Sequence, residues 1–198
     1  MKTKGACAPT PTTWDLESHA QDIALWESFK DGDTASFHEL FRKYYSSLYL
    51  YGYKITQDKE LLEDCIQDLF TELWTSPSKT QVKSVKAYLL KSLQYKVLKG
   101  LQKRSKLLLS DDDTSAPGFE ISHDNLMILR EDQQDNGNKI KSAMTQLSRR
   151  QQEIIYLRFF QNLSYEEISD VMDINYQVAR NLLYQSIKAL RKSLMQPI

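Results

Sequence analysis

Residues that end helices are scarce in this chain, which has 6 glycines and 5 prolines among 198 residues. Apolar residues instead recur at intervals of three and four over long stretches, and alternation of apolar and polar residues is rare. Recurrence at three and four places side chains on one face of a helix, whereas alternation would indicate strands. The sequence therefore predicts an all-α fold.

Cysteine is nearly absent, and so are long apolar runs. Cys7 and Cys65 lie far apart in unlike segments, so we expect neither a disulfide framework nor a metal site. No apolar run approaches the roughly 18 residues of a membrane span, and the start of the chain lacks the apolar core of a signal peptide. We therefore expect a cytoplasmic protein with no cofactor and no segment inserted in a membrane.

Acidic residues are missing from one block of the chain and basic residues are nearly missing from the next, although the formal net charge of the whole chain is zero. Residues 76–110 carry nine basic side chains and no Asp or Glu, whereas residues 111–135 carry eight acidic side chains and only Arg130 as a base. A basic block without acids is typical of a surface that contacts nucleic acid, although a merely solvated helix face is the alternative. The acidic block, which also holds Gly, Pro and Ser, is typical of a spacer.

These changes of composition divide the chain into two small helical domains joined by a flexible acidic linker. Residues 1–17 have no packing face and are expected to form a flexible tail. The expected boundaries are 18–106 for the first domain, 107–138 for the linker and 139–198 for the second domain. Within the linker, one short helical piece is predicted at 126–131.

The C-terminal segment SYEEISDVMDINYQVARNLLYQSIKALRKSL has the pattern of a helix-turn-helix. Ser164 and Glu167 are spaced as a capping box, and Ser148 and Gln151 repeat that spacing before the preceding helix. Turn-forming residues at 173–175 are followed by a helix that has one apolar stripe. In such a motif the second helix lies in the major groove, so its polar side reaches phosphates and base edges. The residues expected on that side are Tyr176, Gln177, Arg180, Asn181 and Tyr184.

Two other predicted helices carry charge on one side. The helix at 58–74 has a continuous apolar side and an acidic outer side, which either is solvated or docks a basic partner. The helix at 84–106 has an apolar stripe that includes Leu89 and Leu93, and its other side carries lysines around Tyr95. An exposed tyrosine framed by lysines is suited to stack on an unpaired base; a partly buried tyrosine with a wet hydroxyl is an equally good interpretation.

In this order the segments resemble the sigma-70 family, and within it the small extracytoplasmic-function (ECF) sigma factors. The acidic helix EDCIQDLFTELW resembles the region-2 helix that docks on the clamp helices of the largest subunit of RNA polymerase. By that resemblance the polymerase contacts are Asp64, Gln67 and Asp68. The segment LSRRQQEIIYLRFFQNLSYEEISDVMDINYQVARNLLYQSIKALR resembles region 4, which reads the −35 promoter element.

The lysine-rich segment KAYLLKSLQYKVLKGLQKR resembles the region-2 helix that binds and helps to open the −10 element. The family usually has Arg-Asn at the place of Gln94 and Tyr95. The residues assigned to the −10 contact, on this helix and the loop before it, are Lys79, Lys83, Lys86, Lys91, Gln94, Tyr95 and Lys99. The resemblance implies a protein without catalysis that confers promoter choice on core polymerase. Its implied partners are the clamp helices and flap of the polymerase, promoter DNA and an anti-sigma factor.

Two other classes of protein compete with this interpretation. A stand-alone helix-turn-helix regulator would carry a ligand-sensing or dimerising domain in its first half, where this chain has an acidic helix face and then an acid-free helix. A nucleic-acid enzyme is disfavoured, because His19, His38 and His123 are scattered and no carboxylate or Cys/His cluster has the spacing of a metal site. For the C-terminal segment alone, a helical hairpin that binds nothing is the alternative.

Overall fold

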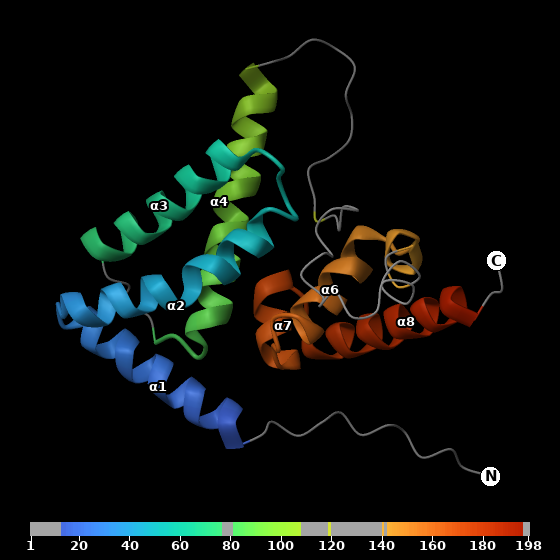
Figure 1. Cartoon of the computed structure of the whole chain (residues 1–198), viewed down its shortest axis with the longest axis horizontal. Coiled ribbons are helices and arrows are strands. Elements are labelled where there is room, and N and C mark those ends of the chain that lie inside the picture. The colour runs from blue at the N-terminus through green and yellow to red at the C-terminus, as the bar shows by residue number, and fades with distance from the viewer. Residues whose placement is uncertain (1–12, 77–80, 108–118, 120–139, 141, 196–198) are drawn as a thin grey trace, which may run out of the picture.

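The structure, a computed structural model, describes residues 13–76, 81–107, 119, 140 and 142–195. Every regular element in that part of the chain is a helix, so the predicted all-α fold is confirmed (Figure 1). With the labels of Figure 1, the helices are α1 (Thr13–Lys30), α2 (Thr34–Gly52), α3 (Lys59–Thr75), α4 (Val85–Leu107), α6 (Arg149–Phe159), α7 (Tyr165–Met172) and α8 (Tyr176–Met195). None of the helices in these described ranges is long and apolar enough to cross a membrane.

The first helix begins earlier than the apolar periodicity indicated. We expected a flexible tail at 1–17, but α1 starts at Thr13, and 1–12 lie outside the described residues. The buried side chains of α1 include Trp26 and Phe29, in its second half. Within residues 13–17 the two apolar side chains stand two positions apart, which is not helical spacing, so the sequence contained no signal for the start of α1.

The first four helices pack around aromatic and aliphatic side chains. α1 lies on α2, and α4 contacts each of α1, α2 and α3. The ring of Trp26 meets Phe29 and Tyr88 edge-on, with centroids 5.6 and 5.3 Å apart. At the end of α2, a Cβ added to Gly52 would lie 2.3 Å from Cδ1 of Leu62, so α2 approaches the buried Leu62 side chain of α3 closely here.

The helices α6, α7 and α8 form the second domain, and α7 and α8 make the predicted helix-turn-helix. Both predicted capping boxes are present, at the starts of α6 and α7. Asp173 ends α7 in the left-handed conformation with φ of 52°. The side chain of Asn175 then accepts a hydrogen bond of 2.8 Å from the amide of Val178 and starts α8. The turn predicted at 173–175 is therefore confirmed.

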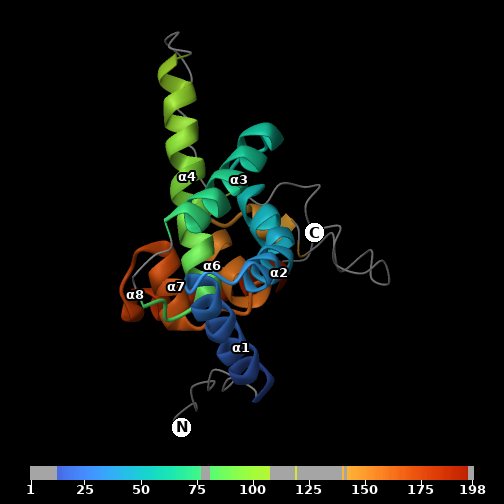
Figure 2. The ribbon, with the colours of Figure 1, turned by 90° about the vertical axis from the view of Figure 1, so that its left-hand side faces the viewer.

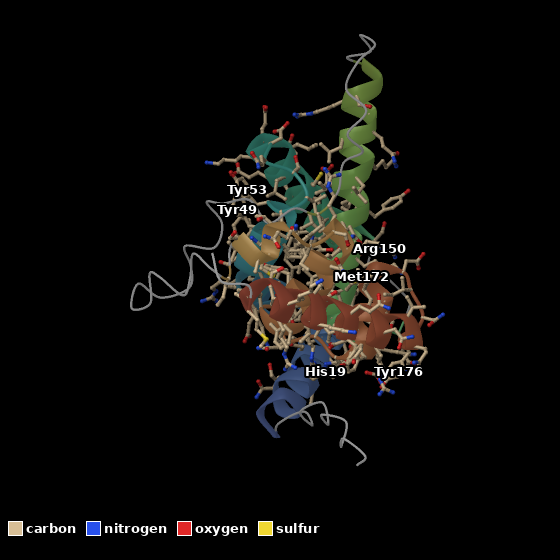
Figure 3. The ribbon with its side chains drawn as sticks, turned by 90° about the vertical axis from the view of Figure 1, so that its right-hand side faces the viewer. His19, Tyr49, Tyr53, Arg150, Met172 and Tyr176 are labelled. Atoms are coloured by element: carbon tan, nitrogen blue, oxygen red, sulfur yellow. The ribbon has the colours of Figure 1, made fainter. Side chains whose placement is uncertain are left out.

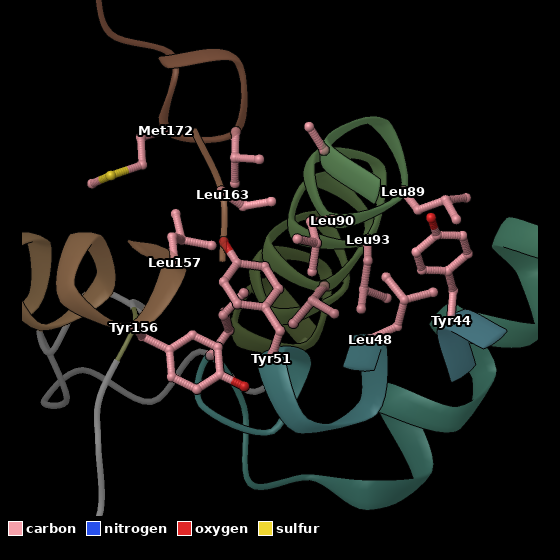
Figure 4. Close-up of a cluster of buried hydrophobic side chains, with 14 of the residues drawn as sticks. Tyr44, Leu48, Tyr51, Leu89, Leu90, Leu93, Tyr156, Leu157, Leu163 and Met172 are labelled. Atoms are coloured by element: carbon pink, nitrogen blue, oxygen red, sulfur yellow. The ribbon is translucent and has the colours of Figure 1, made fainter. Parts of the chain in front are cut away.

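The two domains share one continuous apolar core, which local periodicity did not predict. α4 lies between the other N-terminal helices and α6–α8 (Figure 1), and the view turned by 90° shows α6–α8 behind α1–α4 (Figure 2). The contact is made mainly by α4 and α7. Leu48 of α2 and Leu90 of α4 belong to the same buried cluster as Leu157 and Leu163 of the second domain (Figure 4).

Phe119 is the one residue described between α4 and Ile140, inside the predicted linker 107–138. Its side chain is 4% exposed, and its ring lies near Tyr51 of α2 and Tyr156 of α6, with centroids 5.8 and 5.5 Å away. Phe119 therefore contacts both domains. The predicted helical piece at 126–131 lies outside the described residues.

Candidate functional site

An acidic row lies on the outer side of α3. Its residues Asp64, Gln67 and Asp68 are exposed, as the sequence predicted. Asp58 starts the helix by accepting a hydrogen bond of 3.0 Å from the amide of Leu61, and the apolar side of α3 packs on α2 and α4. That packing fixes the rotation of the helix, so residues spaced by three and four stay together on the solvent side. The row is therefore a solvent-facing set of two carboxylates and one amide on a fixed helix.

Aromatic side chains that are exposed or half-buried lie at the end of α3 and along α2. Trp74, at the end of α3, is 42% exposed, and its ring centroid lies 5.1 Å from that of Phe37 on α2. Further along α2, the rings of Tyr49 and Tyr53 stack with centroids 6.2 Å apart (Figure 3). Aromatic residues at four-residue spacing on α2 were visible in the sequence. Residue type alone, however, does not separate the buried side of a helix from a half-exposed one.

One part of the lysine-rich face of α4 is open to solvent. Tyr95 is 66% exposed, and Nζ of Lys99 lies 5.8 Å from the centroid of its ring. Lys83, two residues before the helix, is exposed too, while Lys79 lies outside the described residues. An aromatic ring with a cation at one face and solvent around it is suited to stack on a base.

The other part of this face contacts the second domain. Gln94, which we expected to point away from the core, donates from Nε2 to Oε1 of Glu153 on α6 at 2.9 Å. Lys86 donates from Nζ to the carbonyl oxygen of Gln161 at 2.6 Å, and burial lowers its pKa. Lys91 forms an exposed ion pair of 3.3 Å with the carboxylate of the residue that ends α7. The DNA contacts assigned to these three residues stay predictions, but all three face α6, α7 or the segment between them here.

Glu153 of α6 lies in this contact, and we had no expectation for it from the sequence. It is 7% exposed, and Oε1 accepts a hydrogen bond of 2.8 Å from the Tyr51 hydroxyl as well as the bond from Gln94. Burial raises the pKa of the Glu153 carboxyl and that of Tyr51. A signal was present, because Glu153 precedes Tyr156 and Leu157 by three and four residues and so lies on the apolar side of α6.

Polar groups of α2 and of the residue before α4 complete the contact. The hydroxyl of Ser47 donates to Oε1 of Gln161 at 2.6 Å. Nζ of Lys54 lies 5.1 Å from the ring centroid of Tyr156, and burial lowers the pKa of Lys54 to about 8. On the side of α7, the hydroxyl of Ser84 donates at 2.5 Å to the glutamate of the second capping box. Each of these three contacts joins a residue of the first domain to a residue of the second.

The polar side of α8 faces solvent. The five residues predicted for it are all exposed: Tyr176, Gln177, Arg180, Asn181 and Tyr184. The guanidinium of Arg180 lies 5.8 Å from the ring centroid of Tyr176, which Figure 3 labels, and Gln177 donates to Asn181 at 3.2 Å. The chain has no Asp or Glu after 173, so this side of the helix carries positive charge only. Within the described residues, no three His, Cys, Asp or Glu side chains gather as metal ligands would.

Two protein-family models match the chain. "Sigma-70 region 2" matches residues 40–107 and "Sigma-70, region 4" matches residues 137–190, so together they cover more than half of the chain. The first match takes in most of α2 and all of α3 and α4, and the second takes in α6, α7 and most of α8. A stand-alone helix-turn-helix regulator would carry another kind of domain in the first half, so this alternative is not favoured.

Relatives of known type agree with the family models. The chain is 25% identical to the RNA polymerase sigma factor SigV of Bacillus subtilis (strain 168) over 144 aligned residues. The aligned region covers 71% of this chain and 79% of SigV. It is 22% identical to the ECF RNA polymerase sigma factor SigM of the same organism over 153 aligned residues. That region covers 77% of this chain and 91% of SigM.

Solved structures share the fold. A TM-score of 0.55, at 16% identity, relates the chain to CnrH in complex with the cytosolic domain of CnrY, over 87% of this chain and 96% of CnrH. The chain also resembles the sigma factor RpoE of Bartonella quintana in complex with the anti-sigma factor NepR, with a TM-score of 0.54 at 18% identity. The match covers 80% of this chain and 96% of RpoE. Taken with both family models and both relatives, the chain belongs to the sigma-70 family, as an RNA polymerase sigma factor of the ECF type.

Proposed function

We propose that this sigma factor binds core RNA polymerase through the acidic row on α3, which consists of Asp64, Gln67 and Asp68. All three side chains are exposed on a helix whose opposite side is buried, and this observation carries the proposal. A packed helix presents its charges at fixed spacing, so little conformational entropy is lost when a basic partner binds. The partner is the pair of clamp helices in the largest subunit, and Trp74, exposed near the end of the same helix, supplies apolar contact area.

The helix α8 reads the −35 duplex from the major groove. Gln177, Arg180 and Asn181 are exposed in its first two turns, and these residue types hydrogen-bond to base edges and phosphates. The buried side of the same helix packs on α6 and α7, which holds the reading side in a fixed orientation. The absence of acidic residues after 173 removes repulsion from the phosphates.

The lysine-rich face of α4 contacts the opened −10 strand. Tyr95 supplies a stacking surface for an unpaired base, and Lys99 supplies a positive charge beside it. Lys79 and Lys83 precede the helix and extend the basic surface along the strand. Lys86, Lys91 and Gln94 extend it along α4 on the side toward α6 and α7.

The protein works as a subunit of a larger assembly, without catalysis of its own. Polymerase holds both domains near the promoter, which raises their effective concentration at the two elements, so weak individual contacts suffice. A formal net charge of zero fits this mode, because the free protein then has little attraction to bulk DNA. The polymerase flap is the expected contact of the second domain, and an anti-sigma factor is the expected regulator. We place the protein in the cytoplasm, with the polymerase.

Run-off transcription on genomic promoter fragments, by core polymerase with and without this chain, tests the function.

Asp64→Lys combined with Asp68→Lys should weaken capture of core polymerase at least about tenfold, because close charge pairs at interfaces contribute on the order of 1.5–7 kcal/mol. Glu39→Lys, on the exposed side of α2, is the matched control. Equal capture of polymerase by both variants would place the polymerase contact elsewhere.

A further inference from the structure

A ladder of four side chains joins the end of α6 to the polar side of α8. The guanidinium carbon of Arg158 lies 5.5 Å from the ring centroid of Tyr165, at the start of α7. The ring of Tyr165 meets that of Tyr176 edge-on, with centroids 5.8 Å apart and planes at 69°, and Figure 3 labels Tyr176. The guanidinium of Arg180 lies 5.8 Å from the Tyr176 centroid. Each of the three helices therefore contributes to one continuous ladder that ends at Arg180.

The inner end of this ladder is held by the core of the second domain. Arg158 lies in the last turn of α6, and its Nη1 donates a hydrogen bond of 2.6 Å to the carbonyl oxygen of Leu163. Leu163 is 1% exposed, and its own amide donates to the carbonyl oxygen of Leu157 at 3.1 Å. Tyr165 is half-buried and packs against the same core. The core therefore fixes the positions of Arg158 and Tyr165.

The outer end of the ladder is available to DNA. Arg180 is exposed, and in the part of the chain that the structure describes no residue forms an ion pair with its guanidinium or accepts a hydrogen bond from it. A guanidinium attracted to an aromatic ring keeps its N–H donors, which lie in its own plane. Bidentate donation to O6 and N7 of guanine needs such an oriented pair of donors. Attraction to a phosphate needs positive charge but no fixed orientation.

Contact with Tyr176 restricts a side chain that would otherwise be mobile. A free arginine loses much rotamer freedom when it binds in one geometry. A ring four positions away on the same helix limits those rotamers before DNA arrives, so less freedom is lost on binding. A guanidinium held in one orientation also matches one base and leaves polar groups unpaired on the others. The ladder therefore favours base reading by Arg180.

We propose that Tyr165 is a positioning residue of the −35 site: through Tyr176, it holds the guanidinium of Arg180 in the orientation that reads a guanine. Arg158 anchors Tyr165 at the inner end of the ladder. Tyr176, which we expected as a DNA contact, acts mainly through Arg180. The reading of a guanine rests on the proposed function of α8, whereas the ordering of the Arg180 side chain does not.

Sequence preference tests the reading. Polymerase complexes that contain the parent or a variant are bound to a promoter identified by run-off transcription, with each −35 position substituted in turn. Arg180→Ala should lower the preference for guanine at one position at least about fivefold, which identifies that position. Tyr165→Ala should lower the preference at the same position about two- to fivefold, as loss of one exposed cation–π contact would, with an unchanged dependence on salt concentration.

Three matched variants separate positioning from other roles. Tyr165→Phe keeps the ring and should retain the parental preference. Phe159→Ala removes an exposed ring next to Arg158 in the chain and should retain it too. The double variant Tyr165→Ala, Arg180→Ala should lose no more preference than Arg180→Ala alone, because Tyr165 acts through Arg180. A Tyr165→Ala chain with the parental preference overturns the proposal, as does an equal further loss when Tyr165→Ala is added to Arg180→Ala.

The mobility of the Arg180 side chain tests the ladder without DNA. In the free full-length protein, the NMR order parameter of the Arg180 Nε–H bond reports motion on the picosecond-to-nanosecond timescale. It should fall in Tyr165→Ala and keep the parental value in Tyr165→Phe and Phe159→Ala, with equal helix content by circular dichroism. An unchanged order parameter in Tyr165→Ala overturns the ladder. A lower order parameter combined with parental preference in Arg180→Ala confirms the ladder and refutes base reading by Arg180.

Discussion

The hydroxyl of Tyr51 donates a hydrogen bond of 2.8 Å to the carboxylate of Glu153, although 102 positions separate the two residues in the chain. The bond joins α2 of region 2 to α6 of region 4. Both groups are buried, and burial raises the pKa of each. A carboxylate removed from water is costly unless its charge is compensated, so this bond joins the domains without making their contact strong.

The raised pKa of Glu153 predicts an unusual dependence of stability on pH. The carboxyl binds its proton more tightly in the folded protein than in the unfolded chain. Its contribution to stability is therefore fully present below its ordinary pKa and is lost as the pH rises through the raised pKa. Tyr51 and Gln94 face the carboxyl from α2 and α4, and Arg150 lies near it on α6. The hydrogen bonds from Tyr51 and Gln94 and the charge of Arg150 all oppose the rise of the pKa, but burial outweighs them.

Glu153→Gln isolates this effect, because an amide oxygen accepts the same two hydrogen bonds without a charge. We expect a higher melting temperature for the variant at pH 7.5, by roughly 2–4 °C for each kcal/mol of desolvation removed. The difference should shrink as the pH falls toward 5. Thermal unfolding of both chains over this pH range checks it. A variant that is less stable than the parent at every pH would mean that the carboxylate stabilises the contact.

Gly52 offers a test of packing inside region 2. A Cβ at this position would lie 2.3 Å from Cδ1 of Leu62 and 3.3 Å from Cδ2 of Leu93. Gly52→Ala should therefore lower the free energy of unfolding by about 1–3 kcal/mol, as overpacking of a core does. Leu62→Val added to the variant shortens the obstructing side chain and should recover part of the loss, in urea unfolding of the single and double variants. No loss in Gly52→Ala would mean that the Leu62 side chain moves aside without cost.

Local pattern predicted the helices and their starts well, since caps and apolar stripes depend on neighbouring residues. The capping boxes, the turn at 173–175 and the outward rotation of the acidic row on α3 agree with the sequence analysis. The start of α1 was placed too late because the apolar residues within 13–17 do not recur at helical spacing. The contact between domains was not predicted, because Gln94 and Glu153 meet only through the tertiary fold.

The position of Phe119 illustrates the same limit. An isolated phenylalanine in an acidic, Gly- and Pro-containing segment gives no periodicity from which a partner can be inferred. Its partners Tyr51 and Tyr156 belong to helices of different domains, so its burial depends on how those domains pack. Burial of such a residue follows from the three-dimensional arrangement alone.

Tyr95 should matter for strand opening more than for duplex binding. Its ring is exposed and lies beside Lys99, and stacking of one base on an aromatic side chain contributes about 1–3 kcal/mol. Tyr95→Ala should lower the permanganate reactivity of promoter thymines in the polymerase complex, whereas Tyr95→Phe, which keeps the ring, should preserve it. Retention of the closed duplex on gels serves as the control. Equal reactivity in the parent and in Tyr95→Ala would make the tyrosine structural.

Arg180 should determine part of the −35 preference. It is exposed in the second turn of α8, on the side that carries Gln177 and Asn181. If it contacts a guanine edge, Arg180→Ala costs about 1–3 kcal/mol on the cognate promoter and flattens the preference at one or two positions. If it contacts a phosphate, the loss of affinity is uniform across sequences. The slope of log affinity against log salt concentration (the salt slope) then falls in magnitude by about one. Lys192→Ala removes the same charge from the far end of α8 and should alter neither quantity. Binding assays of the polymerase complex on a set of −35 variants, at several salt concentrations, separate these outcomes. Unchanged affinity and salt slope in Arg180→Ala would move the DNA-reading side to another face of α8.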